Sequence, residues 1–156
     1  MTDSFLLIKL VHILSATLLF GAGLGTAFFM WRCHRSNDIA AIAVVTRSVV
    51  LADSTFIMPA ILILPVTGYL MIEYMGYSLY TPWIFWSFGL YLLVVACWLP
   101  VVWLQMKMRD LAAVAIENNE ALPATFGLYF RIWTRLGYPA FVSALIVFAL
   151  MVFRPL

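Results

Sequence analysis

Four long apolar stretches constrain the fold of this chain more than any other feature of its sequence. They run over residues 5–31, 55–74, 83–104 and 136–153, and each comes close to the roughly 20 residues that a helix needs to cross the hydrocarbon core of a bilayer. Because the apolar residues are continuous and do not alternate, they predict helices and exclude a transmembrane β-barrel. The expected fold is all-α: a polytopic membrane protein with one domain of four transmembrane helices in an antiparallel bundle.

The composition supports the same class and excludes several others. Hydrophobic residues make up 65% of the chain and charged residues 10%, whereas soluble domains average roughly 45–50% and about 25%. Too few polar side chains remain to cover a soluble enzyme, and the hydrophobicity is too high for a disordered chain. The near balance of basic and acidic residues, without a basic tract, excludes a nucleic-acid partner. The expected partner is the lipid bilayer, which the chain crosses several times.

The distribution of Lys and Arg predicts the orientation in the membrane. Basic residues flank the first and third connections, whereas the second, residues 75–82, has none; the flanking residues are Arg32, Arg35, Arg47, Lys107, Arg109, Arg131 and Arg135. By the positive-inside rule the first and third connections are cytoplasmic, so both termini lie outside. Two further stretches, residues 39–52 and 105–117, extend the second and third helices beyond the bilayer.

The first span carries the clearest candidate site residues. His12 lies about two turns into the span, and an imidazole there can ligate a metal, relay protons or simply hydrogen-bond a neighbouring helix. Lys9 lies on the same face one turn earlier, where it either meets a carboxylate of a bound cofactor or extends its ammonium to the membrane surface. Gly21 and Gly25 form a GxxxG pair, which favours close approach of a second helix and also suits a flat ring.

Asp53 is the acidic residue whose position the sequence leaves most open. It stands before the second span in the polar run Asp53-Ser54-Thr55. We expect it at the membrane interface. The alternative is a buried acid with an arginine partner from a neighbouring helix.

Several segments carry resemblances to known families. The stretches KLVHILSATLLFGAGLGTAFFMWRCHRS, VVLADSTFIMPAILILPVTGYLM and YLLVVACWLPVVWLQMKMRDLA resemble a family of predicted bacterial integral membrane proteins classed as a domain of unknown function. This resemblance implies that the chain lies in the bacterial inner membrane. The first span is also similar, more distantly, to the HemJ-type membrane protoporphyrinogen IX oxidases, four-helix proteins that bind haem b, and to copper-resistance-type membrane domains. The positions that match the oxidases are Lys9, His12, Gly23-Leu24 and His34.

The resemblance to the oxidases implies that His12 is a haem ligand. It implies a haem b cofactor, a redox role and, if the chain is an enzyme, an oxidoreductase. The third span departs from the oxidase pattern, because Ser87 stands where that family carries basic residues. His34 lies roughly 33 Å from His12 along a helix that rises 1.5 Å per residue, so a second ligand is expected from Met71, Met75 or Met151, from water, or from another subunit.

Three functions follow as alternatives. The first is a membrane haem b protein in which His12 is the metal ligand, Lys9 lies near a haem carboxylate, and a quinone or a membrane redox partner exchanges electrons. The second is a membrane scaffold or accessory subunit without a cofactor, assembled through Gly21 and Gly25. The third is a small transporter, which requires a homo-oligomer because one chain offers few polar residues in the membrane.

Overall fold

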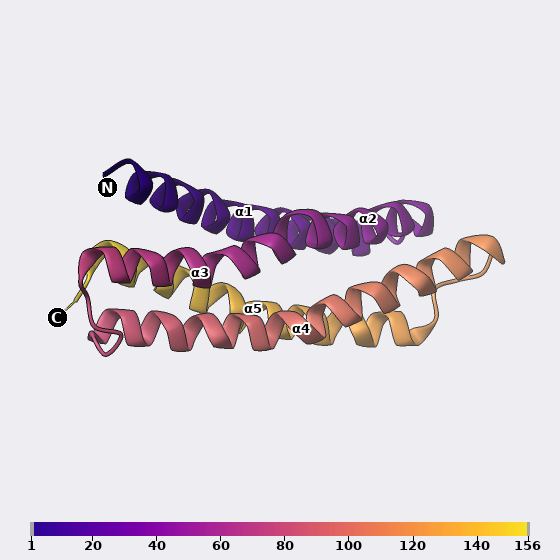
Figure 1. Cartoon of the computed structure of the whole chain (residues 1–156). Coiled ribbons are helices and arrows are strands. Elements are labelled where there is room, and N and C mark those ends of the chain that lie inside the picture. The colour runs from indigo at the N-terminus through magenta and orange to yellow at the C-terminus, as the bar shows by residue number, and fades with distance from the viewer. Residues whose placement is uncertain (1, 156) are drawn as a thin grey trace.

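The computed structural model describes residues 2–155, and these residues are helical apart from short connections (Figure 1). Within this range no β-strand occurs. The elements in chain order are α1 (Thr2–His34), α2 (Ile39–Ala52), the π-helix η1 (Asp53–Ile57), α3 (Met58–Met75), α4 (Pro82–Glu117) and α5 (Ala124–Phe153). Because α2, η1 and α3 follow one another without a break, they form one rod.

The elements thus make four helical rods, namely α1, the α2–η1–α3 rod, α4 and α5. Each contains a segment long and apolar enough to cross a membrane: Asp3–His34, Ile39–Met75, Pro82–Glu117 and Ala124–Phe153. Each predicted span lies inside one of them. The predicted extensions of the second and third helices are also present, as α2 and as the last part of α4. The chain therefore has the predicted all-α fold with four helices of membrane-spanning length.

The helix ends follow the local sequence. The carboxylate of Asp38 accepts hydrogen bonds from the backbone N–H groups of Ala40 and Ala41, which caps α2. Gly76 has φ 68°, a left-handed conformation that glycine adopts without strain, and it ends α3. Pro82 occupies the first turn of α4, where its missing N–H costs no hydrogen bond.

Both termini lie at the same end of the bundle (Figure 1). This arrangement follows from four antiparallel rods, and the 75–82 connection lies at that end as well. The opposite end holds the 34–39 and 117–124 connections. Which end faces the cytoplasm stays a prediction from the distribution of Lys and Arg.

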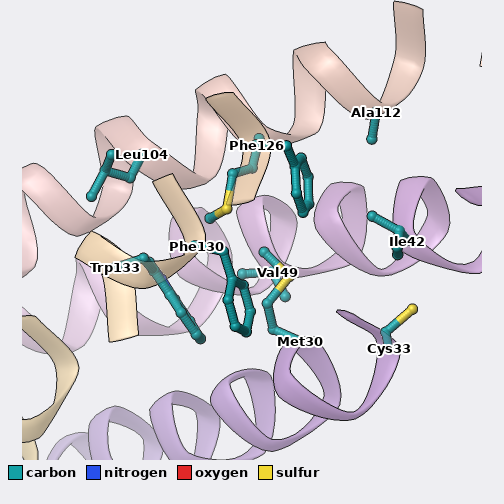
Figure 2. Close-up of a cluster of buried hydrophobic side chains, with 10 residues drawn as sticks. Met30, Cys33, Ile42, Val49, Leu104, Ala112, Phe126, Phe130 and Trp133 are labelled. Carbon is teal, nitrogen blue, oxygen red and sulfur yellow. The ribbon is translucent and has the colours of Figure 1, made fainter. Parts of the chain in front are cut away.

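The packed core lies in the half of the bundle away from the termini, where α1, α2, α4 and α5 meet. Figure 2 shows Phe130 and Trp133 of α5 directed toward Val49 of α2 and Met30 of α1. Met108 and Ala112 of α4 are fully buried in the same cluster. This half therefore resembles the interior of a soluble helical bundle and fixes the four rods relative to one another.

The half that contains the termini is organised differently. There α1 packs mainly on α3, and α4 packs on α5 along its length. The contacts between the two pairs are sparser, because many of the large apolar side chains in this half point outward, as expected for residues that face lipid. The space between the pairs is the cavity described next.

Candidate functional site

A cavity of about 1260 Å³ lies between the α1–α3 pair and the α4–α5 pair. Most small-molecule pockets occupy roughly 300–1,000 Å³, so this one has room for a large ligand. Its walls are almost entirely apolar. The charged residues among those that line it are Lys9, Asp53 and Arg154.

His12 projects from α1 toward α3 in this cavity. Its side chain is buried, and its Nδ1 lies 2.8 Å from Oγ1 of Thr67. The Thr67 hydroxyl donates to the carbonyl of Ile63 at 2.9 Å, and one hydroxyl has a single proton to donate. We assign the ring proton of His12 to Nδ1, so that it donates to Thr67 and the Nε2 lone pair is free for a ligand.

Gly68, the residue after Thr67, lies against the imidazole of His12 and leaves space for it because it has no side chain. A Cβ on Gly68 would lie 3.4 Å from Cε1 of His12, which is the limit of ordinary contact. A larger side chain at this position would displace the ring. Thr67 and Gly68 together hold the imidazole in one orientation, one by a hydrogen bond and the other by leaving space.

Two cations lie at the end of the cavity near the termini. Lys9 precedes His12 by one turn and lines the cavity, although its side chain is largely exposed. Arg154 lines the cavity from the end of α5, and its guanidinium lies 5.7 Å from the centroid of the Trp83 ring. These two charges suit a ligand that has an apolar body and carboxylates at one edge.

Methionines line the cavity on both of its walls. Met71 and Met75 are on α3, one and two turns beyond Thr67, and Met151 is on α5. Phe20 of α1 stacks against Phe141 and Phe148 of α5. Because α1 and α5 are antiparallel, the eight residues from Phe20 back to His12 correspond to about eight residues forward in α5, to a level that includes Met151. Met151 is therefore the methionine on the wall across from His12 at a similar depth.

Asp53 is not the exposed polar residue that we expected at the membrane interface. Asp53 begins η1 in the middle of the bundle and is buried, 4% exposed. With its amide oriented to satisfy both neighbours, Gln105 donates to Oδ2 of Asp53 at 2.6 Å and accepts from Nε1 of Trp133 at 3.2 Å. The alternative of an arginine partner is not met either, because within residues 2–155 the side-chain ion pair is Arg109 with Asp110.

Gly21 and Gly25 lie outside this cavity. A Cβ on either residue would meet no atom within 4 Å. Gly23, between them, does line the cavity. The structure therefore brings Lys9 and His12 together at the cavity and leaves the GxxxG pair on an open face of α1, so a cofactor role for Gly21 and Gly25 stays a prediction without support from the cavity.

His34 is at the far end of α1, in the packed half of the protein. Its ring stacks on Phe130 with the centroids 3.9 Å apart and also contacts Phe126. It lines a separate, smaller cavity of about 370 Å³. Pairing of His12 and His34 on one metal within the chain is excluded by this separation, as the sequence predicted.

The described part of the chain has no group of three or more His, Cys, Asp and Glu side chains arranged to hold a metal ion. Sequence reasoning missed the contact of Thr67 with His12. It also missed Gly68, Trp98, Gln105 and Arg154, which the fold brings to the cavity from α3, from α4 and from the end of α5. The sequence shows Thr67-Gly68 as a polar and a small residue inside an apolar span, but it does not show that they contact His12.

The family comparison covers nearly the whole chain. A family model described as Predicted integral membrane protein (DUF2269) matches residues 6–155. No curated protein and no solved structure matches the chain.

Proposed function

Since the chain belongs to the DUF2269 family of integral membrane proteins, we propose that it is a membrane haem b-binding protein with a redox role. The observation that carries the proposal is the imidazole of His12. Its Nδ1 is bonded to Thr67, and its Nε2, without a hydrogen-bond partner among residues 2–155, belongs to a large apolar cavity. Metal-bound histidines in proteins are held in this manner, with the second ring nitrogen donating to a neighbouring oxygen.

The other residues of the cavity fit a haem. Its apolar walls suit the porphyrin ring, and Lys9 and Arg154 provide one cation for each of the two propionates. Met151, across the cavity from His12, is the residue of this chain that would help His12 to hold the iron. The other two methionines named from the sequence, Met71 and Met75, are on α3, the same helix as Thr67, and therefore do not lie across the cavity from His12.

A haem bound here would supply one-electron transfer, and its potential would depend on its axial ligands and on the polarity of the cavity. The residues of the chain would orient it. Thr67 fixes the His12 tautomer, Gly68 gives the ring its space, and the apolar walls exclude water. The electron would pass to or from a quinone or a membrane redox partner, in the bacterial inner membrane.

The absorption spectrum of the protein purified in mild detergent tests the proposal. The sample is expressed with haem supplied and measured oxidised and then reduced with dithionite. We expect a Soret band and sharp reduced α and β bands, which His12→Ala removes and His34→Ala retains. A featureless spectrum from folded wild-type protein would refute the proposal.

A second candidate, a membrane scaffold, is favoured by one specific observation. The face of α1 around Gly21 and Gly25 meets no other helix of its own chain, and small residues at this spacing suit contact with another helix in lipid. Such a face would form a homo-oligomer. Cross-linking of Gly21→Cys in membranes tests this: a disulfide-linked dimer supports the scaffold, and its absence contradicts it. The transporter remains a prediction that no feature of the cavity favours.

A further inference from the structure

The cavity has a second polar region, at the end farther from the termini. Asp53, Trp98 and Gln105 all line it there. Oδ2 of Asp53 accepts from Gln105, but Oδ1 is buried and has no hydrogen-bond partner among the described residues. Nε1 of Trp98 is also buried and has no hydrogen bond of normal geometry, and it lies toward the Asp53 carboxyl. The donor and the acceptor thus face each other at a cavity wall, outside the strict geometry of a hydrogen bond.

The two groups can close on each other, or each can bond to a ligand group placed between them. A buried donor or acceptor that does neither is unfavourable, and more so when it is charged. Among residues 2–155 the side chains that contact the Asp53 carboxyl are Gln105 and Trp98 on α4, and neither is a cation. Inside a membrane protein, an acidic residue without a cation is a candidate for a functional site.

The backbone at this position is also irregular. Asp53–Ile57 is a π-helix inside an otherwise continuous rod. Single π-turns of this kind occur frequently at functional sites, because the extra residue turns a side chain out of the regular helical pattern. Here the turn begins at the residue that carries the unpaired oxygen.

We propose that Asp53 and Trp98 bind the head group of a lipid-soluble quinone in this cavity. The indole N–H donates to an oxygen of the head group. The Asp53 carboxyl donates to a quinone carbonyl when it is protonated and accepts from a quinol hydroxyl when it is ionised. One carboxyl can therefore bind both redox forms, and the apolar walls accommodate the ring and the tail.

Other lipid classes fit the site less well. A phospholipid would bury a charged head group without a counterion, and a fatty acid would place a second carboxylate against Asp53. A neutral lipid alcohol has the required hydroxyl. The choice of a quinone over a lipid alcohol rests on the redox function proposed above.

The quinone site and the haem site are separate positions in one cavity. From Asp53 to Thr67 the chain advances fourteen residues, which is about 21 Å of helix at 1.5 Å per residue. A quinone head at Asp53 and a ligand at His12 can therefore be bound together. The spacing also allows each site to be tested without the other.

Photo-crosslinking tests the proposal on the full chain in detergent. The probe is an azido-substituted short-chain ubiquinone, competed by decylubiquinone or by decanol, with the haem content measured on the same sample. We expect adducts in η1 and in α4 near Trp98, which decylubiquinone removes and decanol does not. Because the probe needs no haem, a protein without haem that still gives these adducts refutes only the haem proposal.

Variants identify the residues responsible. Asp53→Leu and Trp98→Phe should each lower the yield of adducts about tenfold, the effect of losing one hydrogen bond at a buried site. Asp53→Asn keeps a group that can donate to a quinone carbonyl and should restore most of the yield. Ser54→Ala is the matched control, because Ser54 is exposed and bonds only to its own helix, and it should leave the yield unchanged.

Three results would overturn the proposal. The first is labelling of folded Trp98→Phe at the wild-type level. The second is an equal loss in Asp53→Asn and Asp53→Leu, which would indicate a cation site that needs the negative charge. The third is competition by decanol as effective as that by decylubiquinone, which would indicate unspecific binding of an apolar tail or a lipid alcohol.

Discussion

The imidazole of His12 donates from Nδ1 to Oγ1 of Thr67 across 2.8 Å, and this bond joins α1 to α3 inside the bundle. Thr67 can accept because its own proton is directed to the carbonyl of Ile63 one turn earlier. A polar contact between two apolar helices thus determines which ring nitrogen of His12 is available. The site depends on this relationship, and the first prediction tests it.

Thr67→Val should weaken haem binding without unfolding the protein. Valine has the shape of threonine but offers no acceptor, so the tautomer and the orientation of His12 are no longer fixed. Loss of such an outer-shell partner typically costs about 10- to 100-fold in metal affinity. Haem titration followed at the Soret band measures the change. Thr26→Val is the matched control: Thr26 also lines the cavity but bonds only to its own helix, and an equal loss there would contradict the role of Thr67.

Substitutions of Gly68 should show a graded effect. Gly68→Ala places a methyl group in ordinary contact with the His12 ring, 3.4 Å from Cε1, and should leave the haem content close to that of the wild type. Gly68→Leu should displace the ring and abolish haem binding. Gly21→Leu, which enters open space, serves as the control and should retain haem. Retention of haem in folded Gly68→Leu would show that haem binding does not depend on the space that Gly68 leaves for the His12 imidazole.

The sequence could predict the fold almost entirely, because four continuous apolar stretches of this length leave no other class. It could also predict His12 and Lys9, because ionisable residues are costly in lipid. It could not predict that Thr67 accepts from His12 or that Arg154 reaches the cavity, since these contacts depend on which helices are neighbours. Asp53 shows the same limit: the polar run around it indicated an interface, whereas the π-helix and Gln105 of α4 place it inside the bundle.

Stability should reside in the half of the bundle away from the termini. Phe126 is almost fully buried among α2, α4 and α5, and Phe126→Ala should destabilise the protein by about 3–5 kcal/mol, the usual cost of a large core truncation. Phe85→Ala, an exposed position at the other end, should change stability by less than about 0.5 kcal/mol. Unfolding by denaturant in detergent measures both. Equal effects would show that the cluster in Figure 2 is not the principal core.

The orientation can be tested with single cysteines. Cys33 and Cys97 are both buried and should react slowly with a membrane-impermeant maleimide. Ser78 lies in the connection near the termini and Asn119 in the connection at the opposite end, and both are exposed. In intact bacterial cells Ser78→Cys should be labelled from outside, and Asn119→Cys only after lysis. The reverse pattern would overturn the predicted orientation.

The most direct test of the account is whether free imidazole can replace the side chain of His12. The haem content per chain is measured by the pyridine haemochrome method in wild-type protein and in His12→Gly, with and without imidazole. We predict about one haem per chain in the wild type, loss in His12→Gly, and recovery when imidazole occupies the space against Thr67 and Gly68. Haem retained in His12→Gly without imidazole would contradict the account, because the ligand would then be another residue.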